Sequence, residues 1–406
     1  MALMIKKSLL FLCLFSSAQA ENFEEYQANQ ALLQESDKKE FTQFQKAQMD
    51  AFAEYQKAQY KALESYKKSL GAYWNEPKLS TKKEWISYTP DKKTRTDVDF
   101  QKSKITLETI TSSPDEAKKQ LEIALAKVVT IDNKTVQKTD PLEQILSKIK
   151  KPDGVITKEL KNEPILSNVI FDKTPDKKSV DAYVQENVKD KSIKSEKSKV
   201  VGDKVYSLEI ALPSDTVQKK SQQYYETVKQ FAQKEELSPS LVLAIIQTES
   251  SFNPRATSYV PAFGLMQIVP SSAGLDAYNY LHHEKKLVCG EYLYDSTNNI
   301  EMGSAYFHLL YYNYLSSIKE PLSRLYCAIA AYNTGAGNVA WAFNKNKNIT
   351  EKAKYLITNA AGDINAMSSD EVYSKLLSDL KYEEPKLYLK NVSSRAVTFS
   401  QFYSQK

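Results

Sequence analysis

An aromatic pattern that recurs every 11 residues constrains the fold of this chain more than any other feature. Segments that begin at Phe41, Phe52 and Leu63 repeat it: an apolar residue, an aromatic residue three positions later, then four residues such as Gln-Lys-Ala-Gln. Eleven residues make three turns at about 3.67 residues per turn, so the aromatic side chains stay on one helix face. No Gly or Pro interrupts residues 21–70. We therefore predict a helical arm over residues 21–72, which either packs on the next domain or forms a coiled coil for self-association or for contact with another protein.

Behind the arm, residues 73–213 mix strand and helix patterns. Residues 104–110 and 204–211 alternate apolar and polar side chains as half-buried strands do. Residues 114–129 have helical periodicity with acidic residues in the first turn. Residues 151–199 are rich in Lys, Asp and Ser with little apolar periodicity, so we expect an exposed and partly mobile stretch. The whole predicts an α+β domain that docks on the following domain, with ligand binding as the alternative.

The remaining residues, 214–406, carry mostly helical patterns, and one of these helices ends in an acid. The Ser-Pro pair at 238–239 signals a helix start, the apolar run 241–246 follows, and Asn253-Pro254 opposes continuation. Glu249 thus falls at the C-terminal end of a buried helix, where the macrodipole and the apolar surroundings oppose ionisation. A carboxyl group that is protonated near neutral pH is the proton donor that a glycosidic oxygen needs. Taken alone, a structural Glu that caps or pairs is the alternative.

Further motifs accompany Glu249 in a fixed order along the chain. They are Gly264-Leu-Met-Gln267, Asn299-Ile-x-x-Gly303, Ala331-Tyr332-Asn333 and Glu384-x-x-x-Tyr388-x-x-x-Val392. Each is weak alone, but five elements over about 145 residues resemble the motif series of the lytic transglycosylases of family 1. Those enzymes have a lysozyme-like fold and cleave peptidoglycan. Residues 88–95 and 105–110 also resemble the amino-terminal domain of a membrane-bound member, so the resemblance covers roughly residues 74–392.

The resemblance implies an α+β fold class overall. A mainly α, lysozyme-like catalytic domain over residues 214–406 would follow a smaller α+β domain over residues 73–213 and the helical arm. Ordinary glycosidases need two carboxylates, and only Glu249 stands in the right context. The resemblance resolves this shortage, because the substrate's own 6-hydroxyl on N-acetylmuramic acid acts as nucleophile and leaves 1,6-anhydromuramyl ends without consuming water.

The same resemblance assigns the site residues of this chain. Glu249 acts first as acid and then as base, while Ser250 orients it. Met266 and Gln267 contact the sugar near the point of cleavage, Tyr332 and Asn333 bind the acetamido group and line the groove, and Tyr388 hydrogen-bonds Glu249. Gly264 and Gly303 are expected to be structural, because they permit close backbone approach.

Two other functions stay open at this point. A goose-lysozyme-type muramidase shares the fold and the single essential Glu but adds water, so the reducing end of its product differs. A non-catalytic envelope scaffold built on the 11-residue repeat is the other, although intact Glu249, Gln267 and Tyr332 argue against lost catalysis. The three histidines have no ligand spacing, so neither a metal nor a cofactor is expected. A net charge of +5 is too mild to indicate nucleic acid.

The amino-terminal residues predict secretion. Residues 1–20 combine Lys6-Lys7, a short apolar stretch and Ala18-Gln19-Ala20, the pattern of a cleaved signal peptide. We expect a periplasmic protein, with association with the outer membrane as an addition and lipidation at Cys13 as the alternative to a free mature end. In an oxidising periplasm, Cys289 and Cys327 either form one disulfide or remain separate buried thiols.

Overall fold

The computed structural model describes residues 23–258 and 261–404, and the chain divides into two compact units, residues 1–54 and 55–406. The predicted helical arm is confirmed as α2 (Phe23–Leu70). The predicted signal peptide and Cys13 lie outside the described residues. No helix within the described part of the chain has the length and apolarity that crossing a membrane requires.

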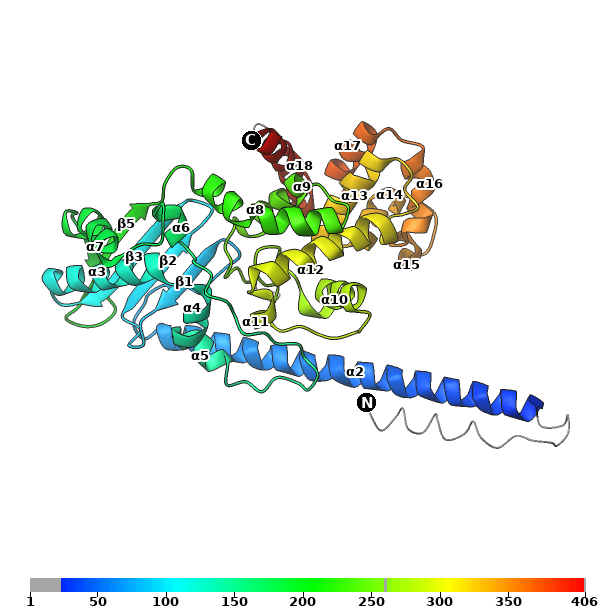
Figure 1. Ribbon diagram of the computed structural model, residues 1–406, viewed down its shortest axis with the longest axis horizontal. Helices are drawn as coiled ribbons and strands as arrows, with labels where there is room; N and C mark the ends of the chain where they lie inside the picture. Colours follow the sequence, from blue (N-terminus) through cyan, green and yellow to red (C-terminus); the bar gives the residue numbers. More distant parts are fainter. Residues whose placement is uncertain (1–22, 259–260, 405–406) are drawn as a thin grey trace. The chain divides into compact units, whose positions relative to one another are not determined.

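Five antiparallel strands form one sheet in the second unit (Figure 1). They are β1 (Glu84–Tyr88), β2 (Thr94–Asp99), β3 (Lys104–Thr111), β4 (Lys194–Lys197) and β5 (Lys204–Ala211), and the spatial order is β1-β2-β3-β5-β4. Both predicted strands are confirmed as β3 and β5. They pair with each other in a register that places Leu107 opposite Leu208, so the apolar residues of their alternating patterns share one face.

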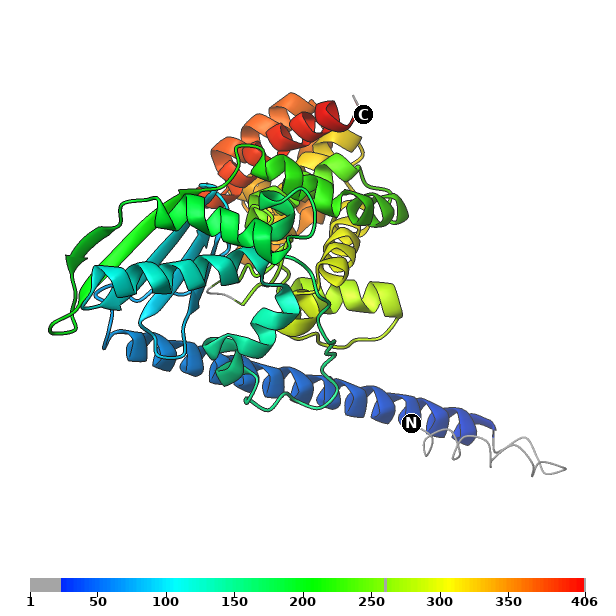
Figure 2. The same ribbon diagram turned by 60° about the vertical axis from the view of Figure 1, so that its left-hand side comes forward.

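Each face of the sheet packs against a helix. The predicted helix over 114–129 is confirmed as α3 (Pro114–Thr130), which lies along one face (Figure 2). The core beneath α3 contains Trp85, Val98, Ile105, Leu107, Leu121, Leu125, Leu208 and Ile210. On the opposite face, Tyr66 and Leu70 from the last turns of α2 join a second buried cluster with Trp74, Ile86, Tyr88, Ile110 and Val205. The carboxyl-terminal end of the helical arm therefore packs on the sheet.

More than half of residues 151–199 are exposed, as expected, but several positions in this stretch are buried. Short elements complete the α+β part: α4 (Asn133–Thr139) and α5 (Pro141–Leu146) before this stretch, and α6 (Ser167–Ile170), α7 (Lys177–Val184) and the π-helical η2 (Gln185–Lys189) within it. Leu166, Val169, Val184 and Val188 are buried in the core beneath α3. Elements of four to eight residues contribute only one or two core residues each, so no apolar periodicity develops in the sequence.

The rest of the chain is helical, and α9 (Pro239–Ser250) lies at its centre. Around it are α8 (Thr216–Lys234), η3 (Pro270–Gly274), α10 (Leu275–His282), α11 (Gly290–Leu293), α12 (Ser296–His308), η4 (Leu309–Tyr314), α13 (Pro321–Thr334), α14 (Ala336–Asn344), α15 (Glu351–Lys354), α16 (Ile357–Asn365), α17 (Ser369–Asp379) and α18 (Glu383–Ser404). Residues 241–246 of α9 are all buried, because α8 and α18 pack against this helix. The predicted α+β fold class, mainly α, is confirmed.

The α+β part docks on the helical part, as expected. Arg255 is only 3% exposed and its guanidinium lies 3.9 Å from the ring centre of Tyr294. It donates to Asn133 Oδ1 at 3.1 Å and pairs with the carboxylate of Glu143. Asn133 in turn donates to the Tyr294 carbonyl at 2.6 Å. This buried ionic cluster joins α4 and α5 to the loop that follows α9.

The two cysteines of the helical part are separate thiols. Cys289 and Cys327 are both free and buried, so the disulfide is not formed. Burial raises the pKa of the Cys289 thiol to about 12, and the nearby Glu291 carboxylate adds to this shift. Burial likewise raises the pKa of the Cys327 thiol, so neither thiol is poised to react near neutral pH.

Candidate active site

Glu249 occupies the last turn of α9, as predicted, but the helix ends sooner than the Asn253-Pro254 signal suggests. The α9 helix ends at Ser250 because Ser251 and Phe252 have left-handed backbone angles, with φ of 51° and 63°. Such angles are unusual for residues other than Gly. The Phe252 ring is fully buried, and this burial holds the turn.

The Glu249 carboxyl group is well suited to donate a proton. The residue is 5% exposed, and burial raises the pKa of Glu249 above its usual value. The nearby Lys82 ammonium, at 3.8 Å from Oε2, opposes this rise, whereas the Glu384 carboxylate adds to it. Removal from water thus outweighs the cation, and the acid is favoured in its neutral form.

Lys82 and Lys83 are the residues at this site that the sequence did not reveal. They lie just before β1, and Lys83 is 166 positions before Glu249 in the sequence. The Lys83 ammonium donates to the carbonyls of Gln247 at 3.1 Å and Thr248 at 2.5 Å. Burial lowers the pKa of Lys83 to about 7, while the Glu249 carboxylate acts in the opposite direction. No pattern in the sequence distinguishes these lysines from solvated ones.

Asn299 organises the loop between Gly264 and Gln267. Its Oδ1 accepts from the Met266 backbone N–H at 2.7 Å, and its Nδ2 donates to the carbonyls of Phe263 at 2.8 Å and Leu293 at 2.9 Å. Gly264 has a φ of 74°, and a Cβ there would lie 2.3 Å from the Leu293 carbonyl oxygen. The expected structural role of Gly264 is confirmed, since no side chain fits between these groups.

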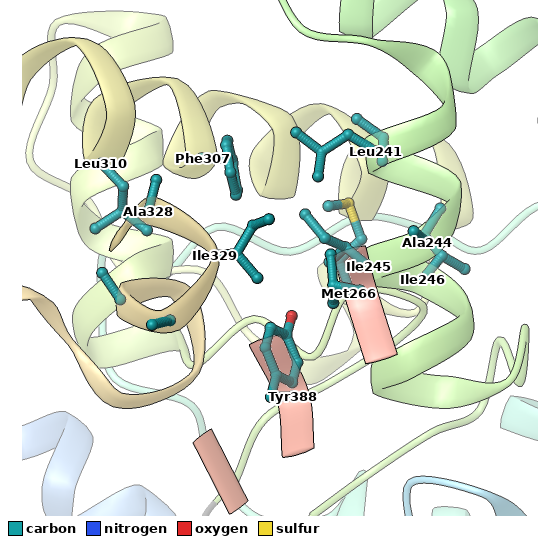
Figure 3. Close-up of a cluster of buried hydrophobic side chains, with 14 of the residues drawn as sticks. Leu241, Ala244, Ile245, Ile246, Met266, Phe307, Leu310, Ala328, Ile329 and Tyr388 are labelled. Atoms are coloured by element: carbon teal, nitrogen blue, oxygen red, sulfur yellow. The ribbon is translucent and has the colours of Figure 1, made fainter. Parts of the chain in front are cut away.

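Met266 and Gln267 differ in what their side chains contact: Met266 packs in the core, whereas Gln267 keeps one polar atom unpaired within the described part of the chain. Met266 is fully buried beside Gly303, where a Cβ would come within 2.3 Å of its sulfur; this confirms the structural role of Gly303. Figure 3 shows Met266 within the apolar cluster that includes Ile245. Gln267 has a left-handed φ of 52° and donates its Nε2 to the Gly264 carbonyl at 3.0 Å. Its buried Oε1 has no hydrogen-bond partner among the described residues, so this acceptor is available to a ligand.

Two tyrosines lie parallel beside the acid. The Tyr332 and Tyr388 rings are 6.5 Å apart with an interplanar angle of 8°. Tyr332 donates its hydroxyl to the Met266 carbonyl at 3.0 Å. The buried Tyr388 hydroxyl makes no hydrogen bond of normal length to a described residue, yet it is near enough to Glu249 to lower the pKa of that acid. The structure therefore brings Glu249, Tyr332 and Tyr388 together.

Ser250 and Asn333 make different contacts. Ser250 is fully buried and donates its hydroxyl to the Ile246 carbonyl at 3.0 Å, within α9. Asn333 donates to Glu384 Oε1 at 3.5 Å, at the more exposed side of the site. Their assigned roles toward acid and sugar remain predictions. No cluster of three or more His, Cys, Asp or Glu side chains that suits a metal ion occurs in residues 23–258 and 261–404.

Residues 226–355 match the model of the Transglycosylase SLT domain family, so this segment is a transglycosylase domain. The chain is 31% identical over 329 residues to membrane-bound lytic murein transglycosylase C of Klebsiella pneumoniae subsp. pneumoniae, covering 79% of this chain and 83% of that protein. Its counterpart in Salmonella arizonae is 31% identical over 323 residues, with the same shares. The 70 kDa soluble lytic transglycosylase of Escherichia coli is structurally similar, with a TM-score of 0.34 and 22% identity over 46% of this chain and 28% of that one. The chain belongs to the family of membrane-bound lytic murein transglycosylase C, which confirms the resemblance that its motifs carry.

Proposed function

We propose that this protein is a peptidoglycan lytic transglycosylase that cleaves the β-1,4 bond between N-acetylmuramic acid and N-acetylglucosamine. The observation that carries the proposal is Glu249 itself. It is a buried carboxyl group with a raised pKa, held at a helix end between a lysine and two tyrosines. The relatives are named lytic murein transglycosylases, and the similarity covers most of both chains, which supports the same reaction class.

In the first step, the neutral Glu249 carboxyl gives its proton to the glycosidic oxygen as the bond from that oxygen to C1 breaks. In the second, the 6-hydroxyl oxygen of the same muramic acid forms a bond to C1, and the Glu249 carboxylate accepts the hydroxyl proton. The acid is thereby restored, and the product is a 1,6-anhydromuramyl end. One residue serves in both directions because its carboxyl group is neutral before the first step and ionised before the second.

The other site residues have supporting roles in this scheme. Gln267 offers its unpartnered Oε1 to a sugar N–H or hydroxyl group. The fully buried Met266 side chain supports the loop from within the apolar cluster and does not itself reach the sugar, and Tyr332 with Asn333 binds the acetamido group. Tyr388 donates to the Glu249 carboxylate after proton transfer, when that group becomes a stronger acceptor. Ser250 supports the acid indirectly, through its hydrogen bond within α9.

The protein acts on glycan strands in the cell envelope. We place it in the periplasm after removal of residues 1–20; the alternative is cleavage before Cys13 and lipidation of that residue, which would associate the protein with the outer membrane. We assign residues 24–72, the helical arm, to contact with an envelope partner or to self-association. These placements rest on the signal-like amino terminus and on the membrane-bound relatives.

Mass spectrometry of muropeptides released from purified sacculi tests the function directly. The purified full chain is compared with its Glu249→Gln variant. Products lighter than hydrolysed muropeptides by one water molecule are the expected result, and the variant should release none. Hydrated ends would instead identify a muramidase. Absence of release by a folded wild-type protein would favour the envelope scaffold.

A further inference from the structure

We propose that residues 81–83 of the α+β domain form part of the catalytic site, with Lys82 as a positioning residue that stabilises ionised Glu249. Lys83 fixes the end of the helix that carries the acid. This inference rests on the proposed function, because it assigns Lys82 a role in the proton transfers of Glu249. It makes the α+β domain a component of the reaction centre as well as a docking partner.

Residues 81–83 are attached to α9 and its following loop at several points. Lys83 donates to two carbonyls in the last turn of α9, and of these the Gln247 carbonyl also accepts the Ser251 backbone N–H at 3.1 Å. Asn253 donates its side-chain N–H to the Lys82 carbonyl at 3.4 Å. The Thr257 backbone N–H donates to the Thr81 carbonyl at 3.4 Å. Backbone contacts on both sides thus hold Lys82 in place, so its ammonium group does not depend on side-chain pairing alone.

Lys82 is shared between two carboxylates. Its Nζ lies 3.8 Å from Glu249 Oε2 and 3.6 Å from Glu384 Oε1. While Glu249 is neutral, Glu384 balances the ammonium charge. After Glu249 has given up its proton, the ammonium faces a second anion and is attracted to it. The interaction is therefore stronger in the state with ionised Glu249, which is the property that assists proton donation.

Other groups around Glu249 act on the same proton. Lys83 favours the anion from the segment before β1, while on α18 Tyr388 favours it and Glu384 opposes it. Tyr332 on α13 and Arg395 on α18 complete the polar surroundings, Arg395 through its influence on Tyr388 and Lys83. Among these groups, Lys82 has the largest effect in lowering the pKa of Glu249 against the rise that burial causes. Its removal is therefore the most direct test.

The test compares the pH dependence of anhydro-muropeptide release for Lys82→Met, Lys82→Arg and Glu384→Gln. Activity falls on the alkaline side where Glu249 loses its proton. Lys82→Met should move this limb to higher pH by about half a unit, the size expected for a partly exposed ion pair. Glu384→Gln should move it to lower pH, and Lys82→Arg should restore the wild-type position.

Lys102→Met is the matched control. It removes an exposed lysine from the same domain that pairs with Asp99 at 3.2 Å and is not among the main groups that act on the Glu249 pKa, so its pH profile should coincide with that of the wild type. An active Lys82→Met with an unchanged alkaline limb, or with one moved to lower pH, would overturn the inference. If the wild type gave no anhydro products, the proposed function itself would fail.

A second measurement covers an inactive Lys82→Met. The free energy of unfolding is measured as a function of pH for two pairs of proteins. One pair is the wild type and Glu249→Gln, and the other is Lys82→Met and the double variant Lys82→Met/Glu249→Gln. The difference within each pair reports the protonation of Glu249 in the folded chain. Its midpoint should lie at higher pH in the Lys82→Met background. Equal midpoints would show that Lys82 has only a structural role.

Discussion

Gly264 is the position where a single methyl group should disturb the site most. In Gly264→Ala the new Cβ would lie 2.3 Å from the Leu293 carbonyl oxygen and 2.4 Å from Asn299 Nδ2. Real Cβ contacts essentially never come so close. Because one neighbour is backbone and the other makes three hydrogen bonds, the loop from Gly264 to Gln267 has to move.

The cost follows from two contributions. A left-handed backbone at an L-residue costs about 1–2 kcal/mol. Displacement of Asn299 weakens its bonds to Met266, Phe263 and Leu293, at about 1 kcal/mol each for bonds that are lost. We expect the free energy of unfolding to fall by about 3–5 kcal/mol, with loss of muropeptide release as Met266 and Gln267 shift.

Urea unfolding with two matched glycine controls separates these contributions. Gly202 has a φ of 85° but no described atom within 4 Å of the position that a methyl group would take, so Gly202→Ala should show the backbone cost alone, about 1–2 kcal/mol. Gly362 lies within α16 with similar free space, so Gly362→Ala should stabilise by about 0.5–1 kcal/mol. If Gly264→Ala unfolded at the same urea concentration as Gly202→Ala, the steric argument would be refuted.

Three further substitutions probe the acid and the domain contact. Glu249→Gln should abolish activity. Because the pKa of Glu249 is raised in the folded protein, the free energy of unfolding of the wild type falls as the pH rises from the usual Glu pKa to the raised one. Urea unfolding at neutral pH should therefore show the variant to be at least as stable as the wild type. Tyr388→Phe should move the alkaline limb of the rate profile to higher pH, because the hydroxyl lowers the pKa of Glu249; an unmoved limb would contradict this. Glu143→Gln leaves Arg255 buried and unpaired, so unfolding should become easier by about 3 kcal/mol, and thermal denaturation indistinguishable from wild type would disprove it.

Periodic segments led to reliable structural predictions. The long helix α2, the strands β3 and β5, and the helix α3 each repeat their apolar residues at the period of one element. The placement of Glu249 at the end of α9 also followed from local signals. The buried residues of 151–199 were missed, because elements this short leave no periodic trace.

Contacts between distant segments were beyond prediction for a different reason. Lys82 and Lys83 precede a strand whose pattern predicts nothing about α9. Their ammonium groups reach Glu249 and the last carbonyls of its helix only because the α+β part docks as it does. The same holds for Arg255, which in the sequence is one arginine in a loop and in the structure is a buried cation. Charges acquire such roles from tertiary structure, and residue type alone does not distinguish them.

The turn after Glu249 shows how the fold offsets local strain at the site. Ser251 and Phe252 both adopt left-handed angles, each at about 1–2 kcal/mol. Full burial of the Phe252 ring contributes about 1.5–3 kcal/mol. The ring lies 6.3 Å from that of Tyr224 on α8 and 6.2 Å from that of Phe399 on α18, and aromatic pairs add about 0.5–1.5 kcal/mol. Tyr224 and Phe399, on helices 175 positions apart at these residues, thus stabilise the turn. The sequence alone identifies Glu249 as the catalytic candidate. Its place in space, however, depends on packing across the whole helical domain.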